Sequence, residues 1–156
     1  MAKMDAAFIK ERAEQLTIVY LTRRDDVRVI RNSMPGGPAL LVSLLHQGQD
    51  VGRYLGVEVS GTVSERGLKR TEQTIEVSPS VLNALTFRDT PYPICLFYFT
   101  MQDDAGYWNW MKAPNNRGGL SSAPAPTLGK LTDQELNSIW AAVERWYQQR
   151  EQLVAA

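Results

Sequence analysis

The sequence has 156 residues, 44% of them hydrophobic, which is enough to bury one sizeable core. Seventeen basic residues balance seventeen acidic ones, which excludes a strong overall attraction to nucleic acid or to an anionic membrane. A single cysteine excludes a disulfide framework and a cysteine-rich metal site. The chain has no long apolar run, and residues 1–5 lead into a charged amphipathic pattern, so we expect a cytoplasmic protein without membrane contact.

The first half of the chain predicts a helix followed by three strands. Ile9, Ala13 and Leu16 recur at helical spacing, with charged residues between them, so a helix over residues 5–22 should pack one face on a sheet. Runs rich in branched and aromatic residues, separated by glycine-containing turns, predict the strands. These strands are expected at residues 27–30, 39–45 and 54–63.

A short helix and two strands are expected next. Ser78 precedes Pro79, as a capping residue precedes proline at a first helical position, so a helix over residues 78–85 is predicted. Residues 92–101 form a nearly continuous apolar run that includes Cys95, which is typical of a strand buried on both faces. Residues 107–112 alternate as a strand joined to it by a hairpin around residues 103–106.

The last part of the chain combines an irregular segment with the clearest helix. Residues 113–130 contain repeated prolines and glycines without periodicity, so they are expected to form an irregular connection. Thr132 and Glu135 make a capping box, and Leu131 and Leu136 can form its hydrophobic staple, which predicts a helix over residues 132–153.

The order of these elements predicts the fold class. A helix, three strands, a helix, two strands and a final helix, without an internal repeat, indicate an α/β or α+β fold. We expect a single domain over residues 1–156, built on a central mixed sheet of about five strands flanked by helices.

Two segments of the predicted strands resemble a known superfamily. Gly37-Pro38-Ala39-Leu40-Leu41 and Gly56-Val57-Glu58-Val59-Ser60-Gly61-Thr62 are similar to the PD-(D/E)XK nuclease-like superfamily, most closely to a bacterial branch of domains of unknown function. That branch carries Gly-x-Asp-aliphatic-aliphatic in the first segment and Gly-Val-(Gln/Glu)-Val-Lys-Gly/Ala-Thr in the second. The resemblance covers residues 8–112 and implies a restriction-endonuclease-like core.

The resemblance also implies a chemistry, and this chain lacks two of its groups. Nucleases of this type hold Mg²⁺ with carboxylate oxygens and activate water with a neighbouring lysine. Ala39 stands at the aspartate position and Ser60 at the lysine position, while Glu58 is retained. Glu58 and Ser60 are two positions apart on a strand and therefore share one face. Glu58 is thus the metal-binding candidate in an active protein.

Further groups for such a site are sought elsewhere in the chain. In the superfamily the first helix often supplies another acid, for which Glu14 is the nearest match and Glu11 the alternate. Both lie off the apolar stripe, and the competing interpretation is a pair of solvated helix glutamates. A migrated group could come from Lys69, or from His46 and Asp50 beside the second strand, but none has a diagnostic spacing.

Two surface features suggest partners. Arg66, Lys69 and Arg70 form the best candidate for a local nucleic-acid patch, with a solvated loop as the alternative, and net charge does not support nucleic acid. Trp108 and Trp110 could form an aromatic surface for a homo-oligomer or a protein partner, could stack bases, or could pack against the last helix.

Three functional hypotheses follow. The first is a catalytically inactive nuclease-fold protein that acts as a binding or scaffolding module and needs no cofactor, since Ala39 and Ser60 lack the required groups. The second is a Mg²⁺-dependent DNA endonuclease with migrated catalytic residues centred on Glu58, with Glu14 in support. The third sets the resemblance aside in favour of a general α/β interaction module. The sequence favours a protein that is not an enzyme.

Overall fold

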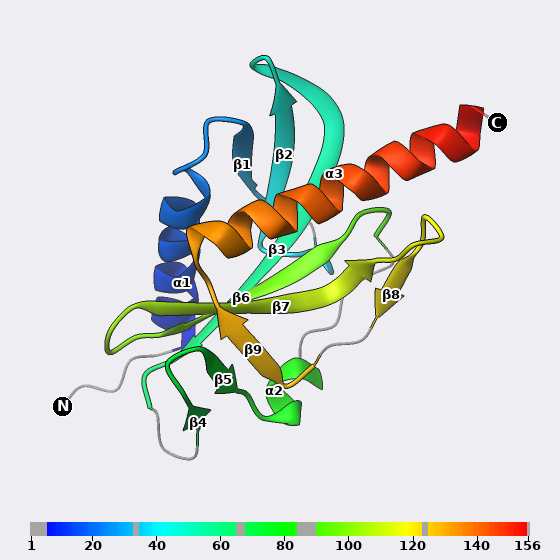
Figure 1. The fold of residues 1–156 in the computed structure, drawn as a ribbon. Helices are drawn as coiled ribbons and strands as arrows, with labels where there is room; N and C mark the ends of the chain where they lie inside the picture. The colour runs from blue at the N-terminus through cyan, green and yellow to red at the C-terminus, as the bar shows by residue number, and fades with distance from the viewer. Residues whose placement is uncertain (1–5, 33–34, 65–67, 84–89, 123–124, 156) are drawn as a thin grey trace.

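A computed structural model describes residues 6–32, 35–64, 68–83, 90–122 and 125–155 of the chain. Three helices and nine strands are assigned in these residues, and Figure 1 shows their arrangement. The helices are α1 (Ala6–Leu21), α2 (Pro79–Asn83) and α3 (Asp133–Ala155). The strands are β1 (Val27–Arg31), β2 (Leu40–His46), β3 (Gln49–Thr62), β4 (Lys69–Arg70), β5 (Thr74–Glu76), β6 (Ile94–Thr100), β7 (Ala105–Pro114), β8 (Leu120–Ser122) and β9 (Thr127–Lys130).

All nine described strands belong to one mixed sheet. Its order is β1-β2-β3-β6-β7-β9-β5-β4, and β8 pairs with β7 beside this path. Strands β3 and β6 run parallel, while the other pairs in the described residues are antiparallel. A parallel pair needs a long crossover, and here the crossover contains β4, β5 and α2.

The first face of the sheet is covered by two helices. Ala13 and Leu21 of α1 and Ile139 and Val143 of α3 belong to one buried cluster with alternate residues of β2, β3 and β6. In Figure 1, α3 passes across the β1–β3 end of the sheet, and α1 stands beside it. The two helices therefore share one core, although more than a hundred residues separate them in the sequence.

The second face of the sheet is covered at β6 by the strands β5 and β9 of the same sheet, together with α2. Ile75 of β5, Leu128 of β9 and Leu82 of α2 pack against Ile94, Leu96 and Tyr98 of β6 in a second buried cluster. Because β5 lies next to β9 in the sheet and also packs on β6, the part of the sheet from β6 to β4 must curl. In Figure 1, β6 and β7 cross the middle of the molecule, and β9, β5 and β4 lie below them.

Most of the expected elements are present, with shifted ends. The predicted helices at residues 5–22 and 132–153 correspond to α1 and α3, and the mixed α+β class with a sheet flanked by helices is confirmed. All seven residues of β6 are buried, including Cys95, as the apolar run predicts. Of the predicted helix 78–85, residues 84 and 85 lie outside the described residues. The third strand is longer than expected because it forms a tight hairpin with β2 through Gln47 and Gly48, both at positive φ.

The expected number of strands was wrong. The sheet has nine described strands instead of about five, since β4, β5, β8 and β9 were not predicted. The segment 113–130 was expected to be irregular, but it contains β8 and β9. These strands have two to four residues each, too short for an alternating pattern to develop, and they are held by pairing with β7 and β5. The pairing of β9 with β5 and β7 joins segments that are distant in sequence, whereas β4 and β8 form hairpins with the strands next to them in the chain.

One of the two side-chain contacts predicted for the cap of α3 is present. Thr132 Oγ1 accepts a hydrogen bond from the Glu135 N–H at 3.1 Å, and Leu131 and Leu136 are both buried, as the capping box and staple require. The carboxylate of Glu135 accepts instead from Trp108 Nε1 at 3.2 Å, so α3 is tied to β7 rather than to its own first turn.

A second contact fixes the other half of α3. The Tyr147 hydroxyl accepts a hydrogen bond from the Tyr54 N–H and donates one to the Tyr54 carbonyl, both at 2.8 Å. Strand β6 begins to pair with β3 only at Gly56. The Tyr147 hydroxyl therefore satisfies the backbone groups of Tyr54, which lie just before the part of β3 that pairs with β6. Arg53 and Glu151 pair at 3.0 Å beside this contact.

Two glycines provide a matched test of this packing. A Cβ at Gly61 would lie 2.6 Å from Met101 Cε and 2.8 Å from the Phe99 carbonyl, whereas a Cβ at Gly129 would meet nothing within 4 Å. We expect Gly61→Ala to lower the free energy of unfolding by roughly 1–3 kcal/mol through overpacking. Gly129→Ala should change it by less than about 1 kcal/mol. Urea unfolding followed by circular dichroism measures both, and equal losses would contradict the close approach at Gly61.

Candidate functional site

Glu58 lies where two strands of the sheet separate. Strand β2 begins at Leu40, which pairs with Val57, so beyond Val57 strand β3 keeps only β6 as a described strand partner. Gly56 and Thr62 direct backbone groups to the β6 side, as their hydrogen bonds to the Pro93 carbonyl and the Met101 N–H show. By alternation, Val59 directs its N–H to the side that β2 has left.

The carboxylate of Glu58 satisfies this N–H group. Glu58 Oε1 accepts a hydrogen bond from the Val59 N–H at 2.9 Å, and the residue is 7% exposed. Burial raises the pKa of Glu58 above its ordinary value, while hydrogen bonds from the backbone of Val59 and Ala39 oppose the shift. Glu58 therefore caps the strand edge at the separation point.

Two side chains of α1 act on Glu58 through their charges. Lys10 lowers the pKa of Glu58 and Glu14 raises it, so the first helix brings one cation and one carboxylate near the buried acid. The Glu14 side chain is 14% exposed and pairs with Arg31 of β1 at 2.8 Å. It is therefore less solvated than its position off the apolar stripe suggested. Glu11, the alternate, also pairs with Arg31 at 3.4 Å, and its side chain is 57% exposed.

Ala39 and Ser60 lie beside Glu58. Ala39 immediately precedes β2 and contributes a backbone interaction to Glu58, while Ser60 follows two residues later on β3. Neither side chain supplies a carboxylate oxygen or an amine. Among the residues that the structure describes, no group of three or more histidine, cysteine, aspartate or glutamate side chains is placed to hold a metal ion.

The other proposed sources of catalytic groups are not brought to Glu58. His46 pairs with Gln49 at the hairpin tip, six residues along β2 from Leu40, which is about 20 Å for an extended strand. Asp50 lies at the same tip, where its carboxylate accepts from the Gly52 N–H at 2.8 Å. Lys69 stands opposite Glu76 in the β4–β5 ladder.

The expected basic patch is mostly engaged by acids. Arg66 lies outside the described residues. Arg70 Nη2 contacts Asp103 Oδ2 at 2.5 Å, and Arg70 Nε donates to the Tyr107 hydroxyl at 2.8 Å. Lys69 faces Glu76, so each described cation of this cluster has a carboxylate nearby.

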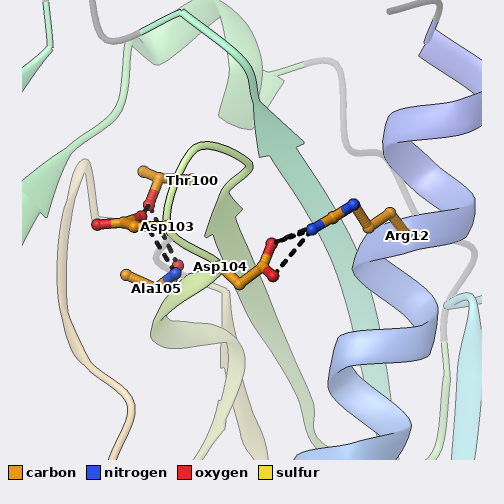
Figure 2. Close-up of polar contacts among 5 residues, drawn as sticks. All are labelled: Arg12, Thr100, Asp103, Asp104 and Ala105. Carbon is orange, nitrogen blue, oxygen red and sulfur yellow. Dashed lines mark hydrogen bonds and ion pairs between the residues drawn. The ribbon is translucent and has the colours of Figure 1, made fainter.

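Asp103 belongs to an acidic turn that joins both sides of the molecule. Figure 2 shows the β6–β7 turn, in which Asp104 receives a forked contact from Arg12 of α1, with Nη2 to Oδ2 at 2.9 Å. Asp103 accepts from the Thr100 hydroxyl at 2.5 Å and from the Ala105 N–H at 3.3 Å. Asp103 and Asp104 therefore bind arginines from β4 and from α1, respectively. We call this turn, with its two arginine contacts, the clasp.

The tryptophans of β7 pack inward. Trp108 and Trp110 are half-buried against the cluster that α3 covers, with their ring centroids 5.5 Å apart in an edge-to-face arrangement. Trp108 is also bonded to Glu135 of α3. The structure thus gives both residues a packing role against the last helix.

Sequence reasoning missed one residue near Glu58. Lys10 is not among the candidates that the sequence indicates, yet it is four residues before Glu14 and so shares its face of α1. That spacing was readable, but the position of the face relative to Glu58 required the fold.

The chain matches no protein-family model and no curated protein. Among the described residues, no helix has both the length and the apolar character needed to span a membrane.

The role of Glu58 as an edge cap can be tested by substitution. Glu58→Ala leaves the buried Val59 N–H without its acceptor, and we expect a loss of about 1–3 kcal/mol in the free energy of unfolding. Glu58→Gln keeps an acceptor oxygen without the charge and should be at least as stable as wild type at pH 7. Equal destabilisation by both variants in urea unfolding would contradict the backbone-cap role.

The same variants predict a pH dependence. Because the folded-state pKa of Glu58 is raised above the unfolded value of about 4.3, the folded state binds the proton first as the pH falls. Wild type should therefore gain stability relative to Glu58→Gln between pH 7 and about pH 4. Urea midpoints across this range measure the difference, and a constant difference would refute the buried, ionisable carboxylate.

The contribution of Asp103 to stability should have the opposite pH dependence. The hydroxyl of Thr100 and then Arg70 hold the pKa of Asp103 at about 2, below the ordinary range. Its stabilising contribution is complete above the unfolded pKa of about 3.9 and is lost as the pH falls toward 2. The stability difference between wild type and Asp103→Asn should thus shrink from pH 5 to pH 2 in thermal unfolding. A stability difference that stays constant from pH 5 to pH 2 would contradict this role of Asp103.

Proposed function

We propose that this chain is a PD-(D/E)XK nuclease-like protein that has lost metal-dependent cleavage and acts as a binding or scaffolding module. One observation carries the proposal. Just beyond the point where the pairing of β2 and β3 ends, the carboxylate of Glu58 accepts a hydrogen bond from the backbone N–H of Val59, close to Ala39 and Ser60. Glu58 thus has a structural use that does not require a metal.

The arrangement of the elements supports the proposed ancestry. The chain begins with α1, continues with the antiparallel series β1-β2-β3, and reaches β6 through a crossover that contains α2. The two segments that carry the resemblance become adjacent, with Leu40 paired to Val57. Ala39 and Glu58 are therefore neighbours across the strands, as a shared metal site in the ancestor would require.

The surface charges favour a partner other than nucleic acid. Arginines along the described chain form ion pairs with acids of other elements or of the same loop. These pairs are Arg12–Asp104, Arg23–Asp133, Arg24–Asp26, Arg31–Glu14, Arg53–Glu151 and Arg70–Asp103. A phosphate backbone would have to compete with these carboxylates, so a protein partner or a second copy suits the module better.

Restoring the missing groups tests the proposal. Wild type should show no Mn²⁺ binding at millimolar concentration by isothermal titration calorimetry, because one carboxylate does not hold such an ion tightly. The double variant Ala39→Asp, Ser60→Lys should gain Mn²⁺ binding that Glu58→Ala in the same background removes. Metal binding by wild type, with Mg²⁺-dependent cleavage of plasmid DNA that Glu58→Ala abolishes, would overturn the loss of activity. Failure of the double variant to bind, while folded, would overturn the ancestral site.

A second candidate function is an active Mg²⁺-dependent DNA endonuclease with migrated groups. The observation that favours it is the electrostatic effect of both Glu14 and Lys10 on Glu58, which would provide a second acid and a lysine from α1. In that case Lys10→Ala should abolish cleavage, whereas Lys112→Ala on β7 should not. Plasmid nicking with Mg²⁺ or Mn²⁺ measures both variants.

A further inference from the structure

A cavity lies at the carboxyl ends of the parallel strands. Its walls come from the end of β3, from β4 and β5, from the start of α2, and from Tyr98 of β6. We call it the seam pocket because it lies where the curled part of the sheet, ending at β4, comes back toward β3. Crevices outside the carboxyl ends of parallel strands and at the mouths of curled sheets are common ligand positions.

The size of the seam pocket suits a small molecule. It encloses about 400 Å³, within the range of roughly 300–1,000 Å³ typical of small-molecule sites. It begins at Thr62, four residues beyond Glu58, or about 13 Å along an extended strand. Glu58, Glu14 and Lys10 do not line it, so the inference does not rest on the proposed function.

Part of the pocket lining is aliphatic. Val77 is 1% exposed and belongs to the second buried cluster, and Leu68 and Val81 pack against that cluster. Together with Pro79 they give the pocket a floor without a charged group. The apolar face of a ligand would be removed from water here.

The rest of the lining supplies hydrogen-bonding groups of balanced charge. It consists mainly of hydroxyl groups, from Thr62, Ser64, Ser78 and Tyr98. The two charged residues, Lys69 and Glu76, are direct cross-strand partners in the β4–β5 ladder and offset each other. A neutral ligand is therefore favoured over an anion or a cation.

Among the polar lining residues, Tyr98 is held in place by its surroundings. The residue is 3% exposed within the second cluster, and burial raises the pKa of its hydroxyl, which interacts with the side chain of Thr62. Thr62 Oγ1 in turn donates to the Ser64 carbonyl at 2.9 Å and accepts from the Ser64 N–H at 3.2 Å. The hydroxyls at the end of β3 are thus held in position before a ligand arrives.

We propose that the seam pocket binds a neutral molecule containing a sugar ring. Each hydroxyl of such a ring both donates and accepts, so it can pair with serine and tyrosine hydroxyls, with Lys69 and with Glu76. The C–H face of the ring would lie on the aliphatic floor. A nucleoside and a free monosaccharide share this chemistry, and the experiment distinguishes them.

The proposal is tested by titrating ¹⁵N-labelled protein with D-ribose, D-glucose, adenosine and ribose 5-phosphate. We expect saturable amide shifts confined to residues around Thr62, Lys69, Val77 and Tyr98 for at least one neutral probe. Adenosine tighter than D-ribose identifies a nucleoside, and D-glucose tighter than both identifies a saccharide. The proposal is overturned if no neutral probe gives a saturable shift up to about 10 mM, or if ribose 5-phosphate binds more tightly than D-ribose. The limit of about 10 mM covers weak binding, since a dissociation constant of 1 mM corresponds to only about 4 kcal/mol of binding free energy.

Variants place the binding in the pocket. Tyr98→Phe removes one hydroxyl and should weaken the best neutral probe about 3- to 10-fold, as the loss of one hydrogen bond implies. Tyr20→Phe is the matched control, because Tyr20 packs its ring on Phe99 outside the pocket, and it should leave the affinity unchanged. Val81→Arg fills the partly exposed floor and should abolish binding while the spectrum of the folded protein persists. Unchanged affinity in both Tyr98→Phe and Val81→Arg overturns the assignment.

Discussion

The parallel pairing of β3 and β6 is the constraint on which the rest of this structure depends. Antiparallel neighbours can be joined by a tight turn, as β2 and β3 are, but parallel neighbours need a crossover that returns to the starting edge. In this chain the crossover carries β4 and β5 instead of a long helix, and β5 joins β9 in the same sheet. The sheet must therefore curl, and the curl creates the second core and the seam pocket.

The same long strand also creates the site at Glu58. Strand β3 has fourteen residues, and its neighbours overlap it only in part, since β2 ends its pairing at Val57 and β6 begins at Gly56. Each offset leaves backbone groups that a side chain must satisfy. Tyr147 satisfies those of Tyr54 at one end, and Glu58 satisfies the N–H of Val59 at the other. The carboxylate of Glu58 therefore serves the fold at this point.

The polar contacts between elements follow one pattern. Arginines from α1, β1, β3 and β4 reach acids on distant elements, as Arg12 does with Asp104 and Arg53 with Glu151. Most of these side chains are partly exposed, so each pair contributes little to stability alone. Their combined effect is to fix turns and helix ends in place and to reduce the positive charge available to a polyanion.

The sequence by itself determined the elements whose signals are local. The stripe of Ala13, the cap at Thr132 and the buried run around Cys95 predicted α1, α3 and β6, because periodicity and capping act within a few residues. The sequence also identified Glu58, Ala39 and Ser60 as the positions to inspect. Only the tertiary structure decided that β4, β5, β8 and β9 exist, because two- to four-residue strands form only against partners. Likewise, only the fold placed Lys10 near Glu58 and turned Trp108 toward α3, because side-chain neighbours across a sheet depend on register, which no local pattern encodes.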